Sequence, residues 1–160
     1  MPEFLTAALT ALADWEVAQA LTQGRWSYAA VSALHVLGIA LLVGGILPLD
    51  LRLLGLWRSV ETRALTAVLT PMAVAGLLLA AATGVLLFSV RPLDYAAVPV
   101  LWAKLALIAA GVLGALAFRW RVGRDPARAG RGLRRLAALT SMTVWLGALA
   151  CGRLIAFTGP

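Results

Sequence analysis

The stretch at residues 64–90, ALTAVLTPMAVAGLLLAAATGVLLFSV, decides the fold, because it runs from Arg63 to Arg91 without one charged side chain. The hydrocarbon core of a bilayer is about 30 Å thick, and an α-helix rises about 1.5 Å per residue, so roughly 20 apolar residues are enough to cross it. This stretch is therefore predicted to be a transmembrane helix.

Three further runs have the same character. Residues 26–49 contain only the titratable His35, residues 95–118 only Lys104, and residues 136–157 only Arg153. Hydrophobic residues make up 62% of the chain and charged residues 13%, whereas soluble domains carry about 25% charged residues. The sequence thus predicts an all-α integral membrane four-helix bundle, with a transmembrane domain at residues 23–160.

The N-terminal segment, residues 1–22, differs from these runs. Its apolar part at residues 4–20 is shorter and mixed, with Asp14 and Glu16 among the apolar side chains. Such a pattern favours a short amphipathic helix that lies in the membrane interface. A frayed tail is the alternative, and the sequence leaves both open.

The distribution of arginine predicts the orientation. Arginine-rich loops stay in the cytoplasm, whereas acidic residues contribute little to topology. The connection at residues 119–135 carries seven arginines and the first connection three: Arg119, Arg121, Arg124, Arg128, Arg131, Arg134 and Arg135, then Arg52, Arg58 and Arg63. We therefore expect a bacterial inner-membrane protein with both termini on the periplasmic side. The net charge of +7 then reflects topology, and no nucleic-acid partner is expected.

Small residues recur at four-residue spacing in residues 64–90, at Gly76, Ala80 and Gly84. Small residues let transmembrane helices approach closely. This stripe predicts a compact bundle, in which the small-residue face of the helix packs against a neighbouring helix or a flat macrocycle.

Three ionisable side chains lie within the predicted spans, where each costs several kcal/mol unless it is paired or hydrated. Counted from the outer end, His35 is about 13 Å deep, Lys104 about 11 Å and Arg153 about 6 Å. The predicted spans contain no Asp or Glu that could neutralise the two cations. A b-type haem would supply the missing anions, because its iron takes an imidazole nitrogen and its propionates seek cations. We therefore predict His35 as the metal ligand, and His35, Lys104 and Arg153 as the cofactor-binding residues.

Each residue also has a simpler interpretation. His35 could hydrogen-bond a neighbouring helix, and Lys104 and Arg153 could extend toward the outer interface. The second axial ligand stays open: Met72 and Met142 lie toward the cytoplasmic side, and Cys151 is nearer in depth. The iron could also be five-coordinate, bind Lys104, or be bridged by a second subunit.

Two short motifs resemble the HemJ-type protoporphyrinogen oxidases and the related CopD-like membrane proteins. Ala-Leu-His at residues 33–35, followed by Gly45, resembles the first helix of that group, and Trp-Ala-Lys-Leu at residues 102–105 resembles its third helix. The resemblance is closest to uncharacterised members with a Leu-His-Val-Leu-Gly first helix, here residues 34–38. It implies a haem-binding role for His35 and a functional requirement for Lys104.

Three functions follow as hypotheses. The first is a membrane b-type haem protein that transfers electrons or handles haem with a redox partner. The second is an enzyme, a HemJ-like protoporphyrinogen oxidase, and the third is a cofactor-free structural subunit of a larger membrane complex. The expected partners are the lipid bilayer, a second copy of the chain, and subunits of a redox complex. Copper transport is disfavoured, because soft-metal paths need clustered Met, Cys or His.

Overall fold

The computed structural model describes residues 3–123 and 129–158, which are largely helical. It contains four helices long and apolar enough to cross a membrane. They are α3 (Arg25–Leu54), α4 (Thr62–Val90), α6 (Pro99–Val122) and α7 (Arg131–Thr158). The predicted all-α class and the four long apolar helices are confirmed, as expected of a multi-pass membrane protein.

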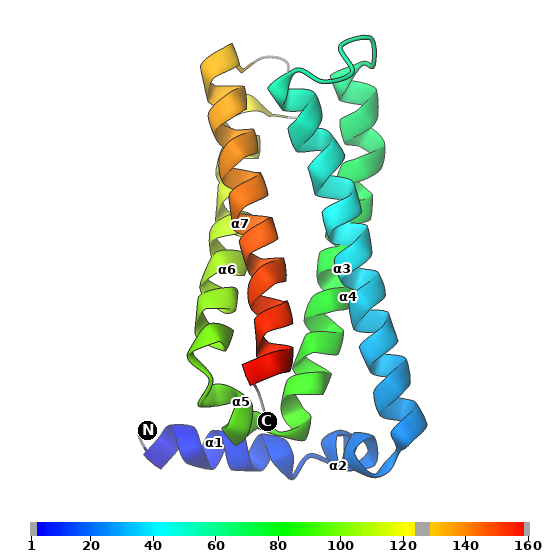
Figure 1. The fold of residues 1–160 in the computed structure, drawn as a ribbon, viewed down its shortest axis with the longest axis vertical. Coiled ribbons are helices and arrows are strands. Elements are labelled where there is room, and N and C mark those ends of the chain that lie inside the picture. Colours follow the sequence, from blue (N-terminus) through cyan, green and yellow to red (C-terminus); the bar gives the residue numbers. More distant parts are fainter. Residues whose placement is uncertain (1–2, 124–128, 159–160) are drawn as a thin grey trace.

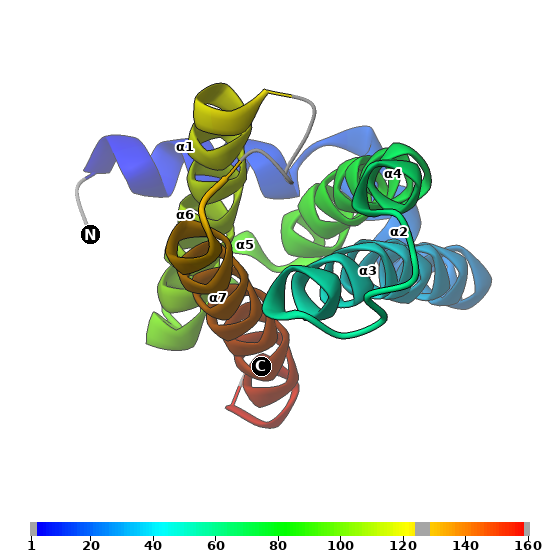
Figure 2. The same ribbon diagram turned by 90° about the horizontal axis from the view of Figure 1, so that it is seen from above.

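The long helices form two antiparallel hairpins. Helix α3 packs mainly on α4, and α6 packs mainly on α7. The hairpins meet through a smaller interface between α3 and α7, as the view along the bundle shows (Figure 2). The core at this meeting point contains Leu42, Ala73 and Trp145, all of which are buried.

The two ends of the bundle differ in charge. The connection from α3 to α4, the last turn of α6 and the first turns of α7 lie at one end (Figure 1). We call this the Arg-rich end, and its described arginines are Arg52, Arg58, Arg63, Arg119, Arg121, Arg131, Arg134 and Arg135. The opposite end holds the short helices α1, α2 and α5 together with the last turn of α7 (Figure 1).

The N-terminal segment forms two helices where one was predicted. Helices α1 (Glu3–Ala13) and α2 (Glu16–Gln23) lie across the opposite end of the bundle (Figure 1). The break falls at Trp15, whose backbone is extended (φ −63°, ψ 131°), and the acidic Glu16 favours a new helix start. Helix α1 packs on α4 and on α5 (Pro92–Ala96).

The long helices extend beyond their charge-free runs at the Arg-rich end. Helix α3 continues from the predicted residue 49 to Leu54 and ends at Gly55, whose φ of 113° is left-handed. The Leu56 N–H closes this end on the Leu51 carbonyl at 3.1 Å, a common way to end a helix. Likewise α6 reaches Val122 and α7 begins at Arg131, so helix occupies much of the predicted 119–135 loop. Residues 124–128 of that loop lie outside the described residues.

The second connection also differs from the prediction. Helix α6 begins at Pro99 and not at residue 95, because the intervening residues form the separate helix α5. Proline is favoured in the first turn of a helix, where its missing N–H costs nothing. Pro92 and Pro99 each begin a helix in this way, and together they produce the bend that leads from the first hairpin to the second.

Candidate functional site

His35 lies on α3, in the half of the bundle that is farther from the Arg-rich end. Its Nδ1 is 3.0 Å from the Thr83 hydroxyl oxygen on α4. Thr83 is buried, with 4% of its surface exposed. The hydroxyl donates its hydrogen to the Leu79 carbonyl at 2.6 Å. With the hydroxyl hydrogen directed to that carbonyl, its oxygen accepts a hydrogen bond from the imidazole in the tautomer that carries the proton on Nδ1.

The tautomer decides which ring nitrogen of His35 is free. The Ala80 carbonyl lies 3.3 Å from the Thr83 hydroxyl. A neutral imidazole that donates from Nδ1 keeps a lone pair on Nε2. Nε2 has no hydrogen-bond partner within residues 3–123 and 129–158. This arrangement, with one ring nitrogen fixed by a hydrogen bond and the other free, is typical of metal-ligating histidines.

Gly84 makes room for the imidazole ring. A Cβ at this position would lie 3.2 Å from His35 Cε1 and 3.6 Å from Nδ1. The absence of a side chain lets the ring lie directly against α4. Gly84 was predicted as part of a packing stripe, and the structure shows that it packs against the imidazole.

Lys104 of α6 approaches the same region. Its Nζ lies near Gly152 of α7, at 3.4 Å from the position of a Cβ there, and the ammonium is within electrostatic range of His35 and of Cys151. No carboxylate lies within 4 Å of it in the described part of the chain. His35 thus lies against α4 beside Thr83 and Gly84, and Lys104 reaches Gly152 of α7, within electrostatic range of His35.

Arg153 is placed differently. It follows Gly152 on α7, and its side chain is exposed. Its guanidinium lies over the ring of Phe157, with 4.6 Å between Cζ and the ring centroid. Phe157 is itself 72% exposed. Arg153 thus lies near the outer surface of the bundle, and the structure does not join its side chain to the pair of His35 and Lys104.

Within residues 3–123 and 129–158, no multidentate protein site for a metal accompanies His35. Among the residues described, no group of three or more His, Cys, Asp or Glu side chains could hold a metal ion. Met72 and Met142, the other soft side chains considered, occupy the Arg-rich half of α4 and α7. A single imidazole suits a metal whose remaining ligands come from a macrocycle.

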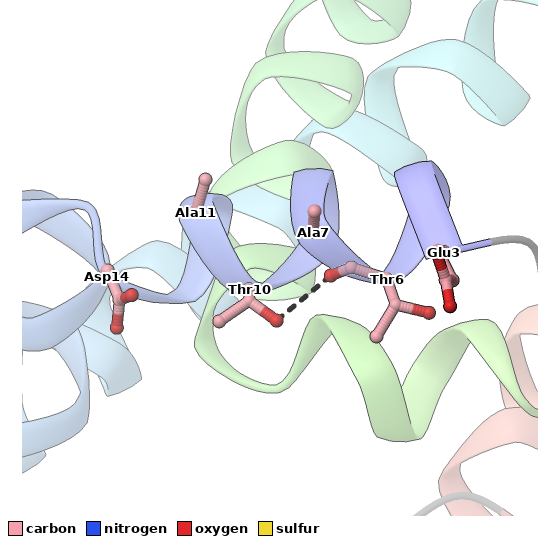
Figure 3. A pocket seen from close by; sticks show the side chains of 6 residues that line it. All are labelled: Glu3, Thr6, Ala7, Thr10, Ala11 and Asp14. Atoms are coloured by element: carbon pink, nitrogen blue, oxygen red, sulfur yellow. Dashed lines mark hydrogen bonds between the residues drawn. The ribbon is translucent and has the colours of Figure 1, made fainter.

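Two surface hollows in the described part of the chain lie away from this region. One is a shallow face of α1 with residues at helical spacing, lined by Glu3, Thr6, Ala7, Thr10, Ala11 and Asp14 (Figure 3). Within it, the Thr10 hydroxyl donates to the Thr6 carbonyl at 2.9 Å (Figure 3). A second hollow is formed by the α3–α4 connection between Arg52 and Arg63. Neither is lined by His35, Lys104 or Arg153.

One buried ionisable residue was missed by the sequence reasoning. Asp50 is only 6% exposed and lies inside α3, because this helix continues beyond the predicted end of the span at residue 49. The prediction ended the helix at residue 49, at the first charged side chain. Gly55, a common helix-ending residue, was the signal in the sequence that α3 continues past Asp50.

Comparisons of the chain with models of protein families, with curated proteins and with solved structures find no match. The similarity to the HemJ-type and CopD-like group therefore stays a prediction. The case for a function depends on the geometry around His35.

Proposed function

We propose that this protein is a b-type haem-binding membrane protein that transfers electrons or handles haem together with a redox partner. The observation that supports the proposal is the hydrogen bond between His35 Nδ1 and Thr83, which in the tautomer that donates from Nδ1 would leave Nε2 unprotonated and free to bind a metal. Imidazole in this form is a common axial ligand for haem iron. When bound, a haem supplies reversible one-electron chemistry.

Lys104 would complement the carboxylates of the cofactor. Its ammonium has no carboxylate within 4 Å in the regions that the structure describes, and an unpaired cation in a membrane helix is costly. A propionate would neutralise it. Arg153, one residue beyond Gly152, is the second cation of the proposal and would hold the other propionate near the surface.

The membrane setting follows the arginine distribution. We place the Arg-rich end in the bacterial cytoplasm and both termini in the periplasm, by the positive-inside rule. The pair of His35 and Lys104 then lies in the periplasmic half of the bilayer. Helices α1 and α2 would lie along the outer interface, where a periplasmic redox partner or a second copy of the chain could approach.

The first experiment is a reduced-minus-oxidised absorption spectrum of the purified, haem-supplied protein beside its His35→Ala variant. We expect a b-type α-band in the wild type and none in the variant. If the well-folded wild-type protein shows no band, the haem proposal is wrong. A cofactor-free structural subunit of a larger complex then becomes the favoured function. The HemJ-like alternative predicts, in addition, that Lys104→Ala abolishes oxidation of protoporphyrinogen.

A threonine pair on α4 supplies a matched control. Thr83 and Thr66 both donate to the carbonyl four residues earlier, at 2.6 and 2.8 Å, but only Thr83 also contacts a histidine. We expect Thr83→Val to weaken haem retention by about 10- to 100-fold, the usual effect of removing a group that orients a ligand. Thr66→Val should behave as the wild type. Equal loss in both variants would show that the effect is structural.

A further inference from the structure

Asp50 is buried in the half of the bundle that His35 does not occupy. It lies on α3, 15 residues after His35, and therefore about 22 Å farther along the helix axis. Its residue exposure is 6%. Its Oδ2 is buried and has no hydrogen-bond partner in the described part of the chain. Such a group within a membrane helix is unusual enough to require a role.

The neighbour of Asp50 across the helix interface is neutral. The Ser141 hydroxyl of α7 lies beside the carboxyl group. On α4, the buried residue near this end is Thr62, also a hydroxyl side chain, and the nearby Arg63 is exposed. The Ser141 hydroxyl can thus exchange a hydrogen bond with Asp50 but supplies no charge.

Two arginines of the same end, Arg52 and Arg58, hydrogen-bond to backbone carbonyls of the α3–α4 connection. Arg52 donates from Nε to the Val60 carbonyl at 2.8 Å, and Arg58 donates from Nε to the Gly55 carbonyl at 3.2 Å. Arg134, two turns before Ser141 on α7, has a buried Nε without a partner in the described regions. No arginine or lysine nitrogen lies within 4 Å of the Asp50 carboxylate among residues 3–123 and 129–158.

An ionised carboxylate in this position would be poorly compensated. Removing an ion from water costs several kcal/mol unless a counter-charge and hydrogen bonds replace the solvent. A protonated carboxyl carries no charge and gains a donor, which the Ser141 hydroxyl can accept. We infer that Asp50, together with Ser141, is a proton-binding site in the Arg-rich half of the bundle, separate from the proposed haem site.

The chemistry of the site favours a proton over a metal cation. Binding a proton requires one carboxylate oxygen and forms one O–H bond, with no other reactant. A hard cation such as Ca²⁺ takes six to eight oxygen ligands, whereas this site offers one carboxyl group and the Ser141 hydroxyl. The proton would exchange with the aqueous side nearer to Asp50, which is that of the Arg-rich end.

Infrared spectroscopy of the protein in liposomes tests the inference directly. We expect the C=O stretch of a protonated carboxyl group at neutral pH, its loss in Asp50→Asn, and its retention in Asp94→Asn. Asp94 is the matched control, because it is about half exposed and forms an ion pair with Arg91 at 2.8 Å. Ser141→Ala should shift the band without removing it, because one hydrogen bond is lost while the proton stays.

Three results would overturn the inference. They are the absence of the band from the wild type at neutral pH, its persistence in Asp50→Asn, and its disappearance when sodium is added at constant pH, which would indicate a cation site. If Asp50→Asn does not fold, wild-type protein with ¹³C-labelled aspartate side-chain carboxyls replaces it. The band must then shift to the lower frequency of the labelled group, and an unshifted band would exclude aspartate.

Discussion

Close backbone contact through glycine distinguishes the α3–α4 hairpin from the α6–α7 hairpin. In the α3–α4 hairpin, a Cβ on Gly38 would lie 2.6 Å from the Ala80 backbone nitrogen and 2.9 Å from the Gly76 carbonyl oxygen. In the α6–α7 hairpin, a Cβ on Gly111 would lie 2.8 Å from the Trp145 ring, and one on Gly152 would lie 3.4 Å from Lys104 Nζ. At Gly38 of the first hairpin glycine thus brings two backbones together, whereas in the second hairpin, as at Gly84 in the first, it leaves space for a large side chain.

This difference matters because a backbone cannot move out of the way as a side chain can. Close backbone contact is the usual role of small residues between membrane helices, and it fixes the distance between α3 and α4. The His35–Thr83 hydrogen bond crosses this rigid interface. Lys104 instead belongs to the hairpin whose contacts are made by side chains, so its position can adjust to a ligand.

The largest effect is expected from Gly38→Ala. The added methyl group meets backbone atoms of α4, so the helices must separate, and we expect a loss of about 3 kcal/mol in the free energy of unfolding. Unfolding in mixed detergent micelles, followed by circular dichroism, measures this loss. Gly44→Ala on the same helix is the control, because nothing lies within 4 Å of its Cβ position. If Gly38→Ala and Gly44→Ala are equally stable, the close backbone contact at Gly38 does not hold α3 and α4 together.

A smaller effect is expected from Gly111→Ala, because the methyl group meets the Trp145 ring. The ring is buried, with 5% of the residue exposed, and must tilt or shift, which we expect to cost about 2 kcal/mol. Replacing Trp145 by Leu in the same chain should remove most of this penalty, a coupling that a double-mutant cycle measures. Gly114→Ala, which faces open space, should be neutral. If Gly111→Ala costs as much stability in the Trp145→Leu chain as in the wild type, contact with the Trp145 ring is not the cause of the loss.

The link between the hairpins is expected to respond to alkaline pH. Burial, followed by the adjacent Tyr28, raises the pKa of Tyr95 above its usual value of 10.0. The protonated phenol therefore stabilises the fold below about pH 10, and this contribution is lost as the pH rises through the higher pKa of the folded state. We expect Tyr95→Phe to lose about 1 kcal/mol at neutral pH and to flatten the decline of stability above pH 10. If stability declines equally above pH 10 in the wild type and in Tyr95→Phe, other ionisable groups cause the decline.

The smallest effect is expected from Gly152→Ala. At 3.4 Å from Lys104 Nζ, the new methyl group makes an ordinary van der Waals contact with the end of a flexible side chain. The change in unfolding free energy should stay within about 0.5 kcal/mol. If haem binds as proposed, the measurable change should be in its retention, because the ammonium is displaced. A loss of stability comparable to that of Gly38→Ala would show that both hairpins are equally rigid.

The sequence predicted the long helices well because each is a long run of apolar residues. Their ends were predicted less well, since charged residues were taken as boundaries while the backbone hydrogen bonds continue through them. Asp50 and Arg52 lie inside α3, and Arg119 and Arg121 lie inside α6. A membrane helix can carry charges in its last turns, where they are covered by neighbouring helices or reach water.

The depth of the candidate-site residues along their helices could be predicted from the sequence, but the direction in which each side chain points could not. Counting residues placed His35 and Lys104 at similar heights, and the structure puts Lys104 within electrostatic range of His35. Counting does not give the direction in which a side chain leaves its helix, so it did not select Thr83 as the partner of His35 or predict that the Arg153 guanidinium lies over Phe157. That information depends on how the helices pack, which short apolar motifs do not specify.

The arginines at one end of the bundle limit how its helices can move. Guanidinium groups stay charged at any accessible pH, and bringing one to the centre of a bilayer costs roughly 2.5–3.5 kcal/mol. The last turn of α6 carries Arg119 and Arg121, and the first turn of α7 begins with Arg131. Both helices therefore resist sliding along their axes. A change of state in this protein would have to proceed by tilting or rotating one hairpin against the other at the α3–α7 interface.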